Sequence, residues 1–311
     1  MIGLLYLFIG IVILYFSGEW LVNGATSLAR NLKIQPFIVA MTLVAFGTSA
    51  PELAISVNAA IKGFEGITIG NIVGSNIANI LFALPVAFLI KIPKKSDVKK
   101  IDCIFLLIIT LLYSLILLTT EHFSFYLGVI MIITLCLYIF FIIYEAKVGG
   151  RKFEVKEEEI LMSLPKSFIF SLIGIMGVFV GAEILVKGAV NVANFFNVSQ
   201  TIIGLSLVAI GTSIPEVATS VVAAYRGQIN FILGAILGSN LFNLLGITGT
   251  ASVITPIITK DTVDLIDIYY LIFSMLVFVL IAFYIRFLNR TLIVLLLLSY
   301  IMYILFLYIK I

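Results

Sequence analysis

The chain has 311 residues, of which 62% are hydrophobic and only 11% are charged, with a formal net charge of +3. So few charges exclude a soluble domain of this size, which needs a charged surface. The apolar residues form continuous blocks of about 20, the length that spans a bilayer as a helix, without the alternation typical of a transmembrane β-barrel.

Ten such blocks follow one another along the chain, separated by charged and turn residues. The first block lacks a basic region before it and a small-residue cleavage site after it, so we interpret it as a span rather than a signal peptide. The sequence therefore predicts an all-α integral membrane protein with ten transmembrane helices. We expect them near residues 2–22, 34–61, 67–90, 101–119, 124–144, 167–186, 198–225, 229–257, 265–285 and 290–309.

The basic residues predict the orientation of these helices. With the N-terminus outside, 15 of the 19 Lys and Arg residues fall in inside loops and four fall outside. Cytoplasmic loops of membrane proteins carry such an excess of positive charge. We expect a multi-pass protein of the plasma membrane with both termini extracytoplasmic.

Two segments repeat each other at a constant offset of 164 residues: residues 10–83 match residues 174–247, and 30 of the 74 pairs are identical. Five helices separate each position from its partner, so the two halves enter the membrane in opposite directions. Inverted repeats are a common plan for transporters, with the binding site between them near the midplane. We expect two five-helix repeats joined by a cytoplasmic linker, in residues 1–144, 167–311 and 145–166.

Two glutamates, Glu52 and Glu216, occupy matching positions in the middle of otherwise apolar spans. A carboxylate at that depth is costly unless it meets a cation or a partner, and no Lys or Arg lies at the same depth. A bound cation is therefore the favoured partner. The alternative is that both are protonated and only brace helices.

The residues before each glutamate supply oxygen ligands. Pro51 and Pro215 each remove a backbone N–H, which frees a carbonyl four residues earlier. Ser49 lies three residues before Glu52 and shares its helix face, and Ser213 repeats this arrangement before Glu216. Carboxylate, hydroxyl and carbonyl oxygens are the ligands that Ca²⁺ and Na⁺ prefer.

A second matched block, residues 70–79 and 234–243, carries glycines and asparagines. Its glycine pairs, Gly70 with Gly74 and Gly234 with Gly238, are spaced for close helix approach. The amide oxygens of Asn79 and Asn243 are candidates to complete a cation cage, and interhelical hydrogen bonding is the alternative for these and for Asn76 and Asn240.

Glu19 and Glu183 are also matched across the repeats, near the ends of their helices. We favour interfacial solvation or pairing with Arg30 or Lys187 over a role in lining an ion passage.

The paired motifs, residues 47–52 and 211–216, together with the two Gly-Ser-Asn blocks, resemble the Ca²⁺/cation antiporter superfamily, and more narrowly a prokaryotic Na⁺/Ca²⁺ exchanger. The resemblance covers both repeats and implies a four-helix core across which the first and sixth helices slide. It implies exchange of three Na⁺ for one Ca²⁺, with no cofactor. The implied cation ligands are Ala45, Thr48, Ser49, Glu52, Ser75, Asn79, Ala209, Thr212, Ser213, Glu216, Ser239 and Asn243.

Some relatives carry Asp at the position of Asn243, and this residue in K⁺-dependent exchangers is associated with K⁺ transport. Asparagine here argues against K⁺ dependence. A Ca²⁺/H⁺ antiporter of the same fold is the nearest alternative, and a passive channel stays open. An intramembrane hydrolase would need two aspartates within the membrane or a histidine beside a serine. We expect no enzyme, because the aspartates lie at helix ends or in loops and the one histidine, His122, lies in a loop. We also expect no nucleic-acid partner. We expect a monomer in the lipid bilayer.

Overall fold

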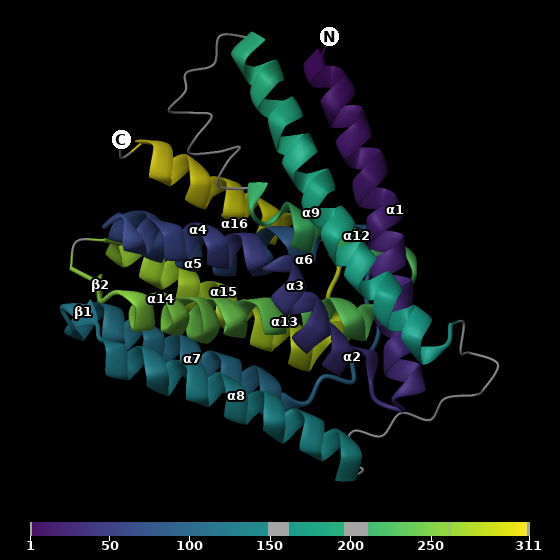
Figure 1. Ribbon diagram of the computed structural model, residues 1–311, viewed down its shortest axis with the longest axis horizontal. Coiled ribbons are helices and arrows are strands. Elements are labelled where there is room, and N and C mark those ends of the chain that lie inside the picture. The colour runs from purple at the N-terminus through teal and green to yellow at the C-terminus, as the bar shows by residue number, and fades with distance from the viewer. Residues whose placement is uncertain (1, 149–161, 196–210, 261, 310–311) are drawn as a thin grey trace.

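The structure is a computed structural model that describes residues 2–148, 162–195, 211–260 and 262–309. These residues are almost entirely helical, which confirms the all-α prediction (Figure 1). The exception is a pair of two-residue strands, β1 (His122–Phe123) and β2 (Ile257–Ile258), which pair antiparallel with His122 opposite Ile258.

Eight helices in the described ranges are long and apolar enough to cross a membrane. Four of them are the single helices α7 (Lys100–Thr119), α8 (Phe125–Val148), α9 (Leu164–Phe195) and α16 (Arg290–Ile309). The others are α1 (Ile2–Asn31), α5–η2–α6 (Glu65–Ala78, Asn79–Ala83, Leu84–Ile90), α13–η5–α14 (Ile229–Leu241, Phe242–Ile247, Thr248–Ile254) and α15 with η6 (Leu265–Tyr284, Ile285–Phe287).

A ninth span is broken in the middle. The segments α2 (Pro36–Val39), η1 (Ala40–Val44) and α3 (Ala45–Thr48) form its first part, and α4 (Ala50–Ile61) is bent from them by 46°. Of the expected seventh span only residues 211–225, which include α12 (Ile214–Tyr225), are described, and residues 198–210 lie outside the described ranges. The count of ten spans therefore stays a prediction.

Two helices extend well beyond the ends expected from the sequence. The first was expected over residues 2–22 and the sixth over 167–186, whereas α1 ends at Asn31 and α9 covers Leu164–Phe195. Those ends were wrong because each helix continues through a more polar stretch beyond its apolar block. Glu19 and Glu183 instead lie inside continuous helices, where each finds a cationic partner.

The most buried helices lie at the centre of the molecule. In the apolar window of α13–α14, 94% of the residues are buried, against 17% in α16. Figure 1 shows α4, α5 and α6 on one side of α13 and α14, with α7 and α8 on the other. Side chains on the outer helices, such as Leu115 and Leu298, are exposed, as expected where lipid replaces water.

A tight helix pair, α1 with α9, crosses these central helices at a steep angle (Figure 1). Glycines bring the two backbones together. A Cβ added at Gly174 would lie 2.5 Å from the backbone nitrogen of Leu21, and one added at Gly10 would lie 2.8 Å from the Cα of Leu185. Because small residues allow such close approach, α1 and α9 pack as one unit.

Candidate functional site

The two central glutamates begin matching helices. Pro51 and Glu52 stand in the first turn of α4, and Pro215 and Glu216 stand in the first turn of α12. Proline suits this place because the first N–H of a helix has no partner within the helix. A carboxylate suits it because the amino-terminal end of a helix carries partial positive charge.

Both glutamates are buried, with Glu52 1% and Glu216 3% exposed. The two carboxylates lie close enough for their charges to repel each other. Two neighbouring buried carboxylates need positive charge between them, from a cation or from protons, to remain stable.

Hydroxyl groups from both halves of the chain converge on these carboxylates. Ser49, at the break between α3 and α4, donates a hydrogen bond of 2.9 Å to Oε1 of Glu216, and Ser239 of α13 donates one of 3.4 Å to the same oxygen. The side chain of Thr48 lies beside Glu216 and that of Thr212 lies beside Glu52. The two motifs therefore meet, although 167 residues separate Ser49 from Glu216.

Two amides also meet across the repeats. Asn79 Nδ2 donates a hydrogen bond of 3.1 Å to Oδ1 of Asn240. Asn79 and Asn243 both belong to π-helical segments, η2 and η5. Such segments in membrane helices expose backbone groups and are frequent at functional sites. Asn76 donates instead to the carbonyl of Ile72 in its own helix, so it braces the helix.

Several buried polar atoms of the predicted ligands have no hydrogen-bond partner within the described residues. Buried polar groups are nearly always paired, so unpaired ones need an explanation. A hard cation such as Ca²⁺ or Na⁺ accepts ligands of this kind. The oxygens are Glu52 Oε2, Glu216 Oε2, Asn79 Oδ1, Asn243 Oδ1 and Ser213 Oγ.

The remaining predicted ligands are Ser75, Ala45 and Ala209. Within the described residues, no hydrogen bond joins Ser75 or Ala45 to the carboxylate of either glutamate. Ser75 is buried on α5, and Ala45 is fully buried at the start of α3. The carbonyl of Ala45 accepts hydrogen bonds from the backbone of Ser49 and from the Thr48 hydroxyl. Ala209 lies outside the described residues.

Comparison with known proteins places this chain among transporters. The family model described as "Sodium/calcium exchanger protein" matches residues 2–144 and 166–309. The chain belongs to the sodium/calcium exchanger family. The family resemblance inferred from the paired motifs is thereby confirmed, and members of this family are membrane antiporters.

Individual relatives cover most of this exchanger. It is 34% identical to "Putative antiporter CaxA" of Alkalimonas amylolytica over 82% of each chain. It is 28% identical to "Sodium/calcium exchanger MaX1" of Methanosarcina acetivorans over 82% of this chain and 84% of that one. The solved structure of the sodium-calcium exchanger NCX_Mj soaked without Na⁺ and Ca²⁺ superimposes with a TM-score of 0.83 at 29% identity, covering 98% and 99% of the two chains. These matches support a cation antiporter with this fold.

The glycine pairs of the exchanger differ between the repeats. A Cβ at Gly234 or Gly238 would overlap the backbone carbonyls of Phe37 and Met41, so close approach is confirmed there. A Cβ at Gly70 or Gly74 would meet no atom within 4 Å, so the expectation is wrong for this pair in the part of the chain that the structure describes.

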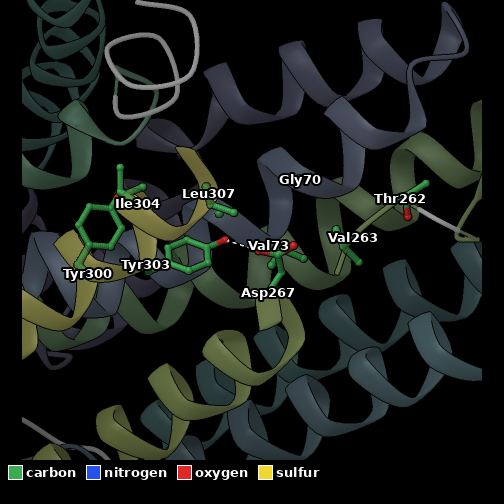
Figure 2. A pocket seen from close by; sticks show the side chains of 10 residues that line it. Gly70, Val73, Thr262, Val263, Asp267, Tyr300, Tyr303, Ile304 and Leu307 are labelled. Carbon is green, nitrogen blue, oxygen red and sulfur yellow. Dashed lines mark hydrogen bonds between the residues drawn. The ribbon is translucent and has the colours of Figure 1, made fainter. Parts of the chain in front are cut away.

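Gly70 and Gly74 instead border a cavity of about 190 Å³ between α5, α16 and the start of α15 (Figure 2). Its polar wall is Asp267, whose Oδ1 accepts a hydrogen bond of 2.9 Å from the hydroxyl of Tyr303. Asp102 and Tyr138 form a similar pair at 2.8 Å between α7 and α8. Both aspartates are buried at the first turn of a helix and join neighbouring helices.

The roles of two polar residues, Asn71 and Arg226, were not predicted from the sequence. Asn71 donates to the carbonyl of Glu52 at 3.2 Å and to Ser56 at 2.9 Å, which ties α5 to the helix of the glutamate. Glu19 pairs with Arg226, a partner that was not expected from the sequence, whereas Glu183 pairs with Lys187 as expected. The sequence did contain a signal for the Glu19–Arg226 pair, because Arg226 matches another basic residue, Lys62, at the repeat offset.

Proposed function

We propose that the chain exchanges Na⁺ for Ca²⁺ across the membrane at the site around Glu52 and Glu216, by alternating access. One observation carries this proposal: each of two buried carboxylates has an oxygen without a partner in the described residues, and hydroxyls from both halves of the chain converge on one of them. The predicted ligand set, with Ala209 of the second half included, is proposed as the cation site.

The charge of the site favours this pair of ions. One Ca²⁺ neutralises two glutamates, whereas three Na⁺ in their place leave one net positive charge. Exchange in that ratio moves one charge per cycle and responds to the membrane potential. The name of MaX1, a sodium/calcium exchanger, and the structures of NCX_Mj soaked with Na⁺, Ca²⁺ or Sr²⁺ support the choice of ions.

The architecture we propose consists of two inverted halves, residues 1–144 and 167–311, joined by a cytoplasmic linker. The repeat offset and the excess of basic residues in alternate loops support this arrangement. Both termini are then extracytoplasmic, in a monomer of the plasma membrane.

The experiment that tests the exchange uses purified protein in liposomes loaded with Na⁺ and diluted into Na⁺-free buffer. We expect uptake of radioactive Ca²⁺ that requires internal Na⁺ and is lost in Glu52→Gln and in Glu216→Gln. Glu65→Gln serves as the matched control, because Glu65 stands at the start of α5 and is partly exposed. Uptake that is unchanged in both central variants would refute the proposed site.

The stoichiometry is tested in the same vesicles with an imposed potential. If three Na⁺ leave for each Ca²⁺ that enters, one positive charge leaves the vesicle. An inside-positive potential then accelerates Ca²⁺ uptake, and an inside-negative one slows it. Uptake that ignores the potential contradicts electrogenic exchange.

Ca²⁺/H⁺ antiport is the second candidate, and the closeness of the two carboxylates favours it, since protons relieve their repulsion as well as cations do. Uptake driven by a pH gradient without any need for Na⁺ would select it. Ca²⁺ flux without a counter-ion of either kind would indicate a channel.

A further inference from the structure

One ion pair ties the α1–α9 unit to the end of a central helix. Arg226, which ends α12, donates from Nε at 3.0 Å and from Nη2 to the two carboxylate oxygens of Glu19 on α1. Such a fork is stronger and more directional than a single contact. The Glu19 side chain is 13% exposed and that of Arg226 is 50% exposed, so water screens the pair in part.

The sequence repeat provides the components of a second pair. At the offset of 164 residues, Glu19 matches Glu183 of α9 and Arg226 matches Lys62, which ends α4. Each basic residue precedes a glycine in the left-handed region, Gly63 with φ 71° and Gly227 with φ 70°. The two turns therefore have the same local backbone, and Lys62 leaves α4 as Arg226 leaves α12.

This second pair is not formed in the conformation described. Glu183 pairs with Lys187 one turn along its own helix, at 2.6 Å, and both side chains are exposed. Lys62 is exposed, and within the described ranges the structure shows no ion pair for it.

The faces of α12 and α4 beside the two pairs also differ, because α1 covers the face of α12 whereas the matching face of α4 is exposed. A Cβ at Gly18 of α1 would lie 2.8 Å from Val222 of α12, and Val222 is buried. Asn58 matches Val222 in the first repeat, but it is exposed on α4. One of two equivalent faces is therefore covered by the α1–α9 unit, and the other is open.

We propose that Glu19–Arg226 and Glu183–Lys62 are alternating latches, each of which holds the α1–α9 unit against one end of the central helices. The proposal rests on the antiport proposed above, which needs two conformations. Because α1 and α9 pack backbone to backbone through Gly10 and Gly174, a movement that takes α1 off α12 also carries α9. In the orientation proposed above, the conformation described has its cytoplasmic latch closed.

The two latches differ in strength, which biases the equilibrium. Arginine engages both carboxylate oxygens, whereas lysine offers one ammonium group and cannot form the fork. Arg226→Lys therefore shifts the population toward the Glu183–Lys62 conformation. A partly exposed pair of this kind changes an equilibrium by about twofold to fivefold.

The test uses cysteine pairs that a short bifunctional thiol reagent joins in liposomes. Cys103 and Cys136 are first replaced by Ala. One variant then carries Glu19→Cys with Arg226→Cys, a second carries Lys62→Cys with Glu183→Cys, and a third carries all four changes. Mass spectrometry of proteolysed protein identifies the cross-links.

We expect each pair to cross-link alone and the four-cysteine protein to contain one cross-link or the other in a single molecule. Adding Arg226→Lys to the Lys62–Glu183 variant should raise its cross-linking rate by about twofold to fivefold. Lys95→Ala, at an exposed lysine outside both latches, is the control and should leave the rate unchanged.

Two results would overturn the latch: no Lys62–Glu183 cross-link while the Glu19–Arg226 pair cross-links, or both cross-links in one molecule. Formation of the Glu19–Arg226 cross-link also reports that the variant is folded. Cross-linking requires neither Na⁺ nor Ca²⁺, so exclusive cross-links in a protein without Ca²⁺ uptake would support the latch and refute the exchange.

Discussion

The contact between α1 and α9 gives the sharpest prediction, because the same added methyl group meets different atoms at two neighbouring glycines. In Gly174→Ala, the new Cβ lies 2.5 Å from the nitrogen and 2.6 Å from the Cα of Leu21. These are backbone atoms, so the helices must separate. Overpacking costs about 1–3 kcal/mol, and the helix propensity of alanine over glycine returns about 1 kcal/mol. Because backbone atoms cannot move aside, the cost lies in the upper part of that range, and we expect a net loss of about 1–2 kcal/mol that Leu21→Ala does not relieve.

Gly177→Ala differs because its Cβ meets only the side chain of Ser17 within contact distance. The Cβ of Ser17 would lie at 2.8 Å, but its Cα lies at 3.8 Å, an ordinary contact. Gly177→Ala alone should therefore destabilise the pair. Adding Ser17→Gly should restore stability to within about 0.5 kcal/mol of the original protein, because the two propensity changes nearly cancel.

Trp20, the one tryptophan of the chain, reports on this interface. Its ring lies edge-to-face with Phe170 of α9 at 6.4 Å between centroids. Thermal unfolding in detergent, followed by tryptophan fluorescence, should give a midpoint about 2–6 °C lower for Gly174→Ala and a near-original midpoint for Gly177→Ala with Ser17→Gly. The reasoning is refuted if Gly174→Ala unfolds like the original protein, or if the double variant is no more stable than Gly177→Ala.

Three further predictions concern single polar groups. Ser49→Ala removes the hydrogen bond of 2.9 Å to Glu216, and because a bond to a charged group is worth about 1.5–3 kcal/mol, we expect the apparent Ca²⁺ affinity of uptake to fall about 10-fold to 100-fold. Equal affinities would show that this hydroxyl does not act on the site. Tyr303→Phe leaves Oδ1 of Asp267 without its donor and should lower thermal stability by about 1–3 kcal/mol while Ca²⁺ affinity stays unchanged; a changed affinity would mean that this pair is coupled to ion binding. Asp264→Ala removes the capping box of α15 and should lower stability by about 0.5–2 kcal/mol, which thermal unfolding would contradict if the midpoint did not move.

Much of the candidate site could be predicted from the chain because its components are repeated. A carboxylate that follows proline in an apolar span is unusual by itself. Because the same pair of residues recurs at a fixed offset, its occurrence by chance is improbable. The structure buries Glu52, Glu216, Ser49, Ser213, Asn79 and Asn243, and it joins Ser49 of one motif to Glu216 of the other; their role as cation ligands stays a prediction. The supporting role of Asn71 could not be found this way, because its counterpart in the second repeat is Ala235 and the pattern is broken there.

The ends of helices were harder to predict, because an apolar block does not show whether its helix continues through the polar residues that follow. Glu19 lies 207 residues from Arg226, and only the packing of α1 on α12 brings them together. With its charge paired, Glu19 remains inside a continuous helix, and α1 extends to Asn31. The predicted ends at residues 22 and 186 were therefore too early.

The sequence by itself determined the helical membrane class, the repeat and the two central acids, because hydropathy and recurrence are properties of the linear chain. Only the tertiary structure decided which groups of the two halves meet, as Ser49 meets Glu216 and Asn79 meets Asn240. It also decided that matched residues differ in their surroundings, as Val222 is covered and Asn58 is exposed. The repeated sequence predicts similar local structure in both halves, so how far matched positions differ in burial depends on how the whole chain packs as well as on the residues themselves.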